Sequence, residues 1–218
     1  MSRVNDLVVS GYTFIEVKNM EFKDSQTKEN LMRAFAGESQ ARNRYTFAAD
    51  IAKKQGQYMI SEVFKFTADQ EKAHAEVFYN HLRELSGQTV FIDGGYPVDV
   101  YDDLITLLKS AHHNEYEEWN DVYQNFADIA EKEGFMKVAA DFRNIAKVEK
   151  MHGDRFKNLA QGLEDNTIYQ AGQSIRWLCL NCGFIFEGAN VPEKCPVCNY
   201  DQGYYIRLGW APYTSDNL

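Results

Sequence analysis

The stretch KVEKMHGDRF, residues 147–156, places acidic and basic side chains where a helix should be apolar. Around it, apolar residues recur at steps of three and four, which is the pattern of one helix face. They are Phe135, Val138, Ala139, Phe142, Ile145, Phe156, Leu159 and Leu163. Continued through the gap, this stripe reaches Glu149 and His152. The sequence therefore predicts a helix that directs a carboxylate and an imidazole toward its own core.

Three further segments carry the same interruption near the middle of an apolar stripe. Glu38 interrupts the first, Glu71 and His74 the second, and Glu115 and Glu118 the third. Their spacings repeat. Glu71 follows Glu38 by 71 − 38 = 33 residues and Glu149 follows Glu115 by 149 − 115 = 34, while 78 residues separate both Glu71 from Glu149 and His74 from His152. Each half of the chain thus supplies a Glu and a Glu-x-x-His pair, whose members share a helix face.

Burial of these side chains is possible only if positive charge compensates them. One uncompensated buried charge costs several kcal/mol, and five clustered carboxylates would exceed the roughly 5–15 kcal/mol net stability of a domain. Two Glu helices and two Glu-x-x-His helices are the ligand set of dimetal carboxylate bundles. Oxygen-rich ligands with two imidazoles favour iron or manganese. The alternative, surface acids on misphased stripes, does not explain seven residues with matched spacings.

The chain is predicted to be mainly α, with four long helices. Asp24 or Ser25 caps the first, which ends near Gly56; the others cover about 57–86, 99–134 and 135–162. Tight turns join the first to the second and the third to the fourth. The intervening segment GQTVFIDGGYPV, residues 87–98, is rich in glycine and forms a crossover. Two long hairpins joined by a crossover make the ferritin-like variant of the four-helix bundle.

All four cysteines lie near the C-terminus, with the spacing C-x2-C-x12-C-x2-C. Cys179, Cys182, Cys195 and Cys198 are expected to form a tetrahedral site for zinc or a single iron, and the spacing does not choose between them. Such a short segment needs a metal to fold. We therefore expect an N-terminal extension over 1–22, a bundle domain over 23–165, a linker over 166–174 and a small metal-knuckle domain over 175–218.

Several other polar residues were weighed as ligands or their supports. Tyr45 and Tyr123 lie one or two turns from predicted ligands and are either core tyrosines or hydrogen-bond donors to ligand carboxylates. His81, His112 and His113 lack a partner three residues away that recurs in the other hairpin. They are interpreted as solvent-facing residues or as supports of the ligands. Glu131, Lys132 and Glu133 crowd a helix end and are interpreted as a solvated face.

The overall composition excludes some classes of partner. The 218 residues carry a formal net charge of −9, which argues against nucleic acid or an anionic membrane as partner. No apolar run reaches the length of a membrane span. The N-terminal apolar run, Leu7 to Val9, is too short for a signal peptide, so a cytoplasmic location is expected.

Four stretches of the bundle resemble the rubrerythrins: AFAGESQARNRY (34–45), ADQEKAH (68–74), NEYEEW (114–119) and EKMHGDRF (149–156). CGFIFEG and CPVC resemble their C-terminal rubredoxin-like module, and the resemblance covers about residues 22–208. It implies a non-haem diiron centre held by Glu38, Glu71, Glu115, Glu118, Glu149 and His152. It also implies that one iron exchanges Glu118 for His74 with redox state, and that the four cysteines hold one iron.

The activity implied by the resemblance is reduction of hydrogen peroxide to water. Electrons would come from an NAD(P)H-dependent reductase or a rubredoxin, and the chain would form a homodimer in which the cysteine site of one chain approaches the diiron site of the other. Two alternatives remain. A ferroxidase or iron-handling bundle would use the same carboxylates, and a zinc-ribbon interaction module would use the cysteines without redox chemistry.

Overall fold

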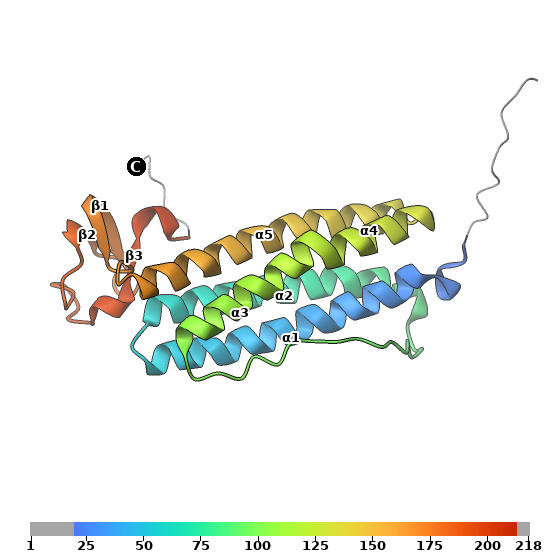
Figure 1. The fold of residues 1–218 in the computed structure, drawn as a ribbon, viewed down its shortest axis with the longest axis horizontal. Helices are drawn as coiled ribbons and strands as arrows, with labels where there is room; N and C mark the ends of the chain where they lie inside the picture. Colours follow the sequence, from blue (N-terminus) through green and yellow to red (C-terminus); the bar gives the residue numbers. More distant parts are fainter. Residues whose placement is uncertain (1–19, 213–218) are drawn as a thin grey trace, which may run out of the picture.

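The computed structural model describes residues 20–212. The long helices form a bundle with a small β domain at one end (Figure 1). The helices are α1 (Gln26–Lys54), α2 (Tyr58–His81), α3 (Leu104–Glu117), α4 (Tyr123–Lys132) and α5 (Met136–Glu164). A π-helical segment, Glu118–Val122, joins α3 to α4. The ferritin-like bundle is therefore confirmed, while most of the predicted 1–22 extension lies outside the described residues.

Local sequence signals set the helix ends. The Ser25 side chain accepts a hydrogen bond from the Lys28 amide at the start of α1, and Asp103 does the same for Thr106 at the start of α3. Gly56 and Gly134 adopt φ of 74° and 91°, a left-handed conformation that ends the first helix of each hairpin.

The predicted third helix differs from the structure in two ways. It begins at Leu104 rather than near Asp99, because Asp99 is used by the crossover, where its carboxylate accepts from Arg44 and Asn114 at 2.8 Å each. It is also interrupted by the π-helical segment, which starts at Glu118. Such insertions are frequent at functional sites, and propensity does not reveal them.

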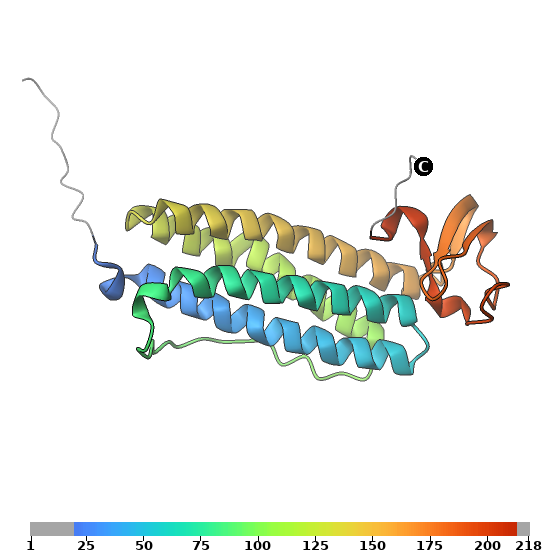
Figure 2. The same cartoon turned by 180° about the vertical axis from the view of Figure 1, so that it is seen from behind.

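The crossover between α2 and α3 runs along α1 in Figure 1 and Figure 2. Ion pairs attach it at two points, Arg33 to Asp93 at 2.7 Å and Arg44 to Asp99 at 2.8 Å. Between them the Tyr96 hydroxyl donates to the Arg33 carbonyl. The segment thus forms a strap over the face between α1 and α3.

The apolar core of the bundle is split into two clusters. One contains Leu31, Phe78 and Phe142, and the other contains Phe64 and Phe156. On each of α1, α2 and α5, the predicted ligands lie between the residues of these two clusters. The bundle therefore has a polar layer between two apolar layers, which is the interruption seen in the sequence.

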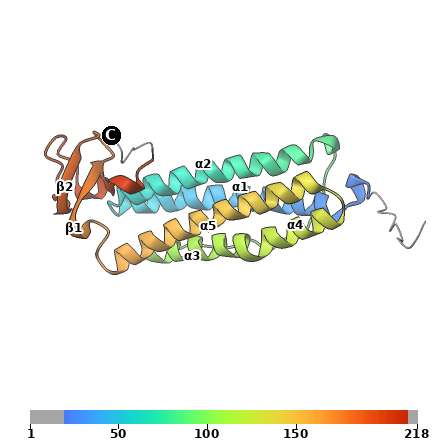
Figure 3. The same cartoon turned by 90° about the horizontal axis from the view of Figure 1, so that it is seen from above.

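The small domain contains a three-stranded antiparallel sheet, in the order β2 (Ile185–Asn190), β1 (Gln170–Cys179) and β3 (Tyr205–Arg207). Figure 3 shows it beyond the ends of α1, α2 and α5. Tyr204 stacks on Tyr58 with ring centroids 4.1 Å apart, and a Cβ on Gly203 would lie 1.9 Å from the Gly56 carbonyl oxygen. The domain division stays a prediction; β1 begins inside the predicted linker, after two buried residues, Ile168 and Tyr169.

One predicted surface acid has a structural role instead. Glu133, at the end of α4, accepts hydrogen bonds from the Gln26 and Thr27 amides and from the Thr27 hydroxyl. It therefore satisfies free amides at the start of α1 from 106 residues away. No sequence pattern indicated that these two distant helix ends meet.

We predict that Glu133→Ala lowers the free energy of unfolding by about 1–2 kcal/mol, because it leaves helix-start amides and a buried threonine hydroxyl without their acceptor. Urea denaturation of the metal-loaded protein measures this. Glu131→Ala is the matched control, since Glu131 pairs with Arg143 on the surface and its loss should change little. Equal effects of the two variants would contradict the capping role.

Candidate metal centres

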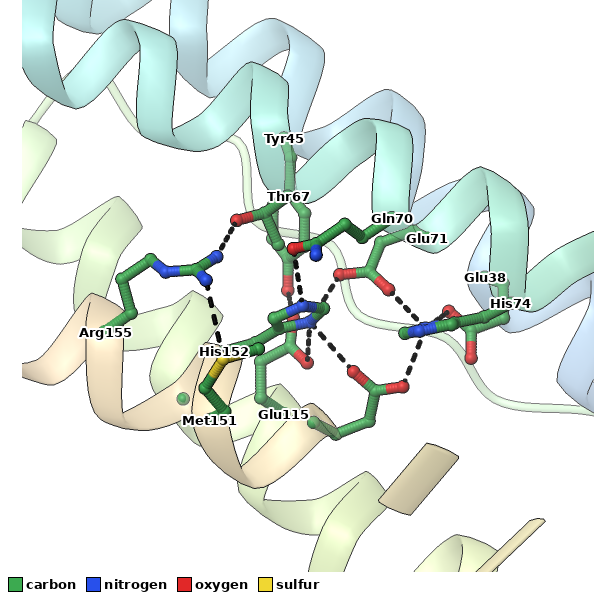
Figure 4. Close-up of polar contacts among 12 residues, drawn as sticks. Glu38, Tyr45, Thr67, Gln70, Glu71, His74, Glu115, Met151, His152 and Arg155 are labelled. Atoms are coloured by element: carbon green, nitrogen blue, oxygen red, sulfur yellow. Dashed lines mark hydrogen bonds and ion pairs between the residues drawn. The ribbon is translucent and has the colours of Figure 1, made fainter. Parts of the chain in front are cut away.

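Four helices contribute the polar layer of the bundle. Glu38 comes from α1, Glu71 and His74 from α2, Glu115 from α3, and Glu149 and His152 from α5. All six side chains are buried, and Glu38, Glu149 and His152 have no exposed area. Figure 4 shows five of them, Glu38, Glu71, His74, Glu115 and His152, converging from different helices on a common centre. The structure therefore brings together six of the seven predicted bundle ligands.

The six residues form two clusters that share two carboxylates. Glu38, Glu71, His74 and Glu149 make one, and Glu71, Glu115, Glu149 and His152 make the other, with ligand atoms within 4.8 Å of one another in each. Glu149 lies 2.9 Å from Nδ1 of His74 through Oε1 and 2.9 Å from Nδ1 of His152 through Oε2. Glu71 spans the same two imidazoles, at 3.0 Å from each. These two carboxylates are therefore shared between the two candidate metal-binding clusters.

The donor atoms of the layer fit a pair of metal ions. Five carboxylate oxygens, from Glu38, Glu71, Glu115 and both oxygens of Glu149, are buried without a hydrogen bond, and so is Nδ1 of His152. Some of these atoms are close to one another, but they are not aligned for hydrogen bonding. Unpaired buried ligand atoms that converge are unfavourable by themselves and favourable around cations. The mixed oxygen and imidazole set suits iron or manganese.

Burial, and then mutual repulsion, raises the pKa values of two carboxylates in the polar layer. Burial, followed by the charges of Glu71 and Glu149, raises the pKa of Glu115 to about 8. Burial also raises the pKa of Glu38 well above its usual value. Burial opposes charge on the two histidines, but neighbouring carboxylates raise the pKa of His74 to about 9 and that of His152 to about 12. Without metal, protons therefore supply the compensating charge.

Two buried tyrosines contact the outer carboxylates. The Tyr45 hydroxyl donates to Oε1 of Glu115, and the Tyr123 hydroxyl donates to Oε1 of Glu38. The structure therefore supports the interpretation of both tyrosines as hydrogen-bond donors to ligand carboxylates. Burial raises the pKa of both hydroxyls well above its usual value, so each keeps its proton and orients its carboxylate.

Sequence reasoning missed Gln70, whose Oε1 lies 3.0 Å from Nε2 of His152. This contact leaves Nδ1 of His152 directed at the carboxylates, as ring-nitrogen partners do around metal ligands. No residue pattern distinguished Gln70 from any other polar residue beside a ligand. The other histidines lie outside both clusters: His81 pairs with Asp141, His112 contacts the Gly153 carbonyl and His113 pairs with Glu117.

Glu118, the seventh predicted bundle ligand, lies outside the two clusters. It is half-buried as a residue, yet its carboxylate is shielded from solvent. Burial and then the charges of Glu115, Glu149 and Glu71 raise its pKa well above the usual value. It lines a pocket of about 240 Å³ together with Gly37 and the strap residue Tyr96. A Cβ on Gly37 would lie 3.9 Å from Oε1 of Glu118, so the carboxylate sits against α1.

The four cysteines meet as predicted, with all four sulfurs within 4.8 Å and no disulfide among them. Sγ of Cys179 lies 3.8 Å from that of Cys198, and Sγ of Cys182 lies 3.7 Å from that of Cys195. A tetrahedral metal with bonds of about 2.3 Å requires sulfurs about 3.75 Å apart. The sulfur positions therefore fit one metal ion.

Two knuckle turns hold the cysteines. Gly183, with φ of 78°, and Asn199, with φ of 62°, each follow the second cysteine of a pair. Their amides donate to the carbonyls of Cys179 and Cys195 respectively, at 2.8 Å in both turns. Asparagine is the usual substitute for glycine in this left-handed conformation, so the two turns are equivalent.

The two centres define a ferritin-like dimetal carboxylate protein with a fused four-cysteine metal domain. A family model described as Rubrerythrin matches residues 29–160, and one described as Rubrerythrin, rubredoxin-like domain, matches residues 177–206. The chain belongs to the rubrerythrin family, whose members are generally oxidoreductases. The bundle site is accordingly a diiron centre, and the four cysteines form a rubredoxin-like iron site.

Curated relatives cover most of the chain. Rubrerythrin of Clostridium perfringens is 46% identical over 184 residues, which are 84% of this chain and 94% of that protein. Rubrerythrin of Porphyromonas gingivalis is 42% identical over 187 residues, 86% of this chain and 92% of that one.

Among solved structures, nigerythrin in a mixed-valence state has a TM-score of 0.57 and 25% identity, covering 93% of this chain and all of that one. Dithionite-reduced symerythrin from Cyanophora paradoxa, at 20% identity, has a TM-score of 0.56 over 73% of this chain and 98% of that one, and shows the fold alone. Among the described residues, no helix is long and apolar enough to cross a membrane.

We predict that the bundle binds divalent metal more tightly as pH rises, by about tenfold per pH unit for each proton displaced. The proton on His74, whose pKa is about 9, must leave before its Nδ1 can bind. The same raised pKa stabilises the metal-free fold below about pH 6.5, and that contribution is lost as pH rises through about 9. Anaerobic competition titrations with Fe²⁺ at pH 6.5 and 8.5, after the cysteine site is filled with zinc, measure the change. A pH-independent affinity would contradict protonated ligands.

Proposed function

We propose that this protein is a peroxidase that reduces hydrogen peroxide to water at the bundle centre. The observation that carries the proposal is the pair of buried clusters bridged by Glu71 and Glu149, in one chain with a four-cysteine site. When bound, two ferrous ions supply the two electrons that convert one hydrogen peroxide and two protons into two waters. The four cysteines would hold an iron that supplies single electrons, so two such electrons would be needed for each peroxide reduced.

The side chains around the centre would bind the metal ions, orient the ligand carboxylates and shield the site from bulk water. Glu71 and Glu149 hold two positions at a fixed separation, and Tyr45 and Tyr123 fix the outer carboxylates by hydrogen bonds. The two apolar clusters on either side exclude bulk water, which strengthens charge interactions inside. These properties favour controlled two-electron chemistry over release of partly reduced oxygen species.

We further propose that Glu118 and His74 alternate as ligands of one metal position. Nδ1 of His74 is within 3.0 Å of the bridging carboxylates, whereas Glu118 lies outside both clusters, beside a pocket. The π-helical segment that begins at Glu118 supports this role, since such insertions loosen regular helix geometry locally. A carboxylate that joins the site adds negative charge, which favours the more oxidised pair.

The electron route is part of the proposal. Cys182 is exposed, so the four-cysteine site is open to a protein donor, either a rubredoxin or an NAD(P)H-dependent reductase. A groove of about 880 Å³ runs from Leu180 and Asn181 beside the cysteines to Gln70, the neighbour of His152. A homodimer in which the cysteine site of one chain approaches the bundle centre of the other, in the cytoplasm, is also proposed.

A ferroxidase would use the same carboxylates and is the alternative to exclude. It has no need of a tethered one-electron site, and a zinc ribbon has no need of the diiron layer. Both features occur in this chain, which favours the peroxidase.

We predict that fully reduced protein is oxidised by about 1.5 hydrogen peroxide molecules per chain, because the diiron pair and the cysteine iron hold about three electrons in all. Anaerobic stopped-flow titration, following the visible absorption of the oxidised iron–thiolate site, measures this. Oxidation that is faster with dioxygen than with peroxide would instead indicate a ferroxidase.

Two neighbouring acids provide a matched pair for the same experiment. Glu118→Ala should slow oxidation by peroxide by at least about tenfold, since it removes the proposed exchanging ligand. Glu117→Ala should leave the rate unchanged, because Glu117 is exposed and pairs with His113. Equal rates for the two variants would contradict the role of Glu118.

A further inference from the structure

The pocket of about 240 Å³ that contains Glu118 lies beneath the strap, between the strap, α1 and the π-helical segment. Two of its lining residues border the polar layer. They are Glu118 itself and Tyr123, which is 1% exposed and donates a hydrogen bond to Glu38. At its other side the pocket is lined by Tyr96 of the strap, which is 39% exposed. The pocket therefore extends from the surface toward the candidate metal site.

The larger groove, of about 880 Å³, meets the polar layer at a different kind of boundary. It reaches Gln70, whose Oε1 lies 3.0 Å from Nε2 of His152. The His152 side chain has no exposed area, so this imidazole and Gln70 separate the groove from the carboxylates. The pocket beneath the strap is instead bordered by a carboxylate, that of Glu118.

Ion pairs hold the roof of the pocket, residues 94–97, on both sides. Asp93 precedes the roof and pairs with Arg33 at 2.7 Å. Asp99 follows the roof and pairs with Arg44 at 2.8 Å, and this second pair is largely shielded from solvent. Both arginines belong to α1. The roof is thus attached to one helix at two points.

The Tyr96 ring packs against two glycines. A Cβ on Gly37 of α1 would lie 3.7 Å from Cε1 of Tyr96, and a Cβ on Gly94 would lie 3.0 Å from its hydroxyl oxygen. The hydroxyl donates to the Arg33 carbonyl at 3.1 Å. The same Cβ on Gly37 would lie 3.9 Å from Oε1 of Glu118, so the ring and the carboxylate face one point on α1. Tyr96 therefore limits the width of the pocket beside Glu118.

The size and the lining of the pocket suit a small, neutral, polar molecule. Its volume of about 240 Å³ is below the roughly 300–1,000 Å³ of sites for drug-sized ligands, but well above the share of about 30 Å³ that one water occupies. The Glu118 carboxylate disfavours anions. The lining combines polar with apolar side chains, namely Gln40, Asn114 and Glu118 with Ala34, Val122 and Phe126.

We propose that this pocket is the site through which hydrogen peroxide reaches the bundle centre, and that the Tyr96 ring excludes bulky organic hydroperoxides. The inference rests on the proposed peroxidase activity and adds to it a site of entry and a size limit on the substrate. Tyr96 determines specificity by its volume and takes no part in the chemistry. Removal of its ring leaves the ligands of the polar layer in place and widens the approach to them.

The test compares hydrogen peroxide with cumene hydroperoxide as oxidants of the fully reduced, iron-loaded protein, by anaerobic stopped-flow absorption. With two electrons and two protons, cumene hydroperoxide gives 2-phenyl-2-propanol and water. Tyr96→Ala should raise the rate with cumene hydroperoxide, relative to that with hydrogen peroxide, by at least about tenfold, since a few atoms in a pocket wall discriminate by this much. Tyr96→Phe keeps the ring and should retain the ratio of the unmodified protein.

Val98→Ala is the matched control. Val98 lies on the same part of the strap, is 82% exposed and is not among the residues that line the pocket, so the ratio should stay unchanged. If Tyr96→Ala does not fold, Tyr96→Leu also shortens the side chain and should raise the ratio in the same direction. Equal ratios in the Tyr96 and Val98 variants, or a ratio in Tyr96→Phe as high as in Tyr96→Ala, would overturn the inference.

A second measurement does not depend on turnover. Crystals of the protein with zinc, which has no redox chemistry, in both metal sites are soaked with cumene hydroperoxide. Density for its phenyl ring is expected in the pocket of Tyr96→Ala and not in that of the unmodified protein. Absence of the ring from the pocket of the variant, or its presence in the unmodified protein, would contradict the size limit.

The two experiments separate this inference from the peroxidase proposal. If hydrogen peroxide oxidises the unmodified protein but the ratio does not respond to Tyr96→Ala, the inference about the pocket fails alone. If hydrogen peroxide does not oxidise the unmodified protein, the peroxidase proposal fails, and the crystal soak still decides whether Tyr96 limits what enters the pocket.

Discussion

The carboxylates buried at the centre of the bundle repel one another, and the fold is stable only when positive charge offsets this repulsion. Glu38, Glu71, Glu115 and Glu149 lie in one solvent-free layer, where uncompensated charge would cost several kcal/mol per group. Protonated His74 and His152 offset part of this charge in the absence of metal, as their raised pKa values show. A pair of iron ions does so when bound. The helices therefore supply the site, and the site determines whether the packed helices are stable.

This constraint explains the organisation of the whole chain. Apolar clusters on both sides of the layer provide the packing that the layer itself lacks, and tyrosine hydroxyls fix the outer carboxylates. The small domain packs on the α1–α2 turn through Tyr204 and Gly203, so the second metal site has a defined position at one end of the bundle. Two metal centres with different chemistry are thus held within one fold, one suited to two-electron reduction and one to single-electron transfer.

The sequence predicted the features that recur in both helical hairpins. The matched spacings of Glu38, Glu71, Glu115 and Glu149 indicated the bundle and its ligands, because helix periodicity converts spacing directly into a shared face. It did not predict the π-helical segment at Glu118, the Gln70 contact to His152 or the cap that Glu133 provides for α1. Each of these depends on where distant segments meet, which local periodicity does not encode.

The most direct test of the account is the location of metal in crystals of the protein purified with its native metals. Anomalous diffraction data collected just above and just below the iron absorption edge distinguish iron from zinc and manganese. The account predicts two iron peaks among the carboxylates and imidazoles of the polar layer, flanked by Glu71 and Glu149, and one among the four cysteines. A polar layer with no metal, or with a single ion, would contradict the claim that a metal pair holds these charged side chains together.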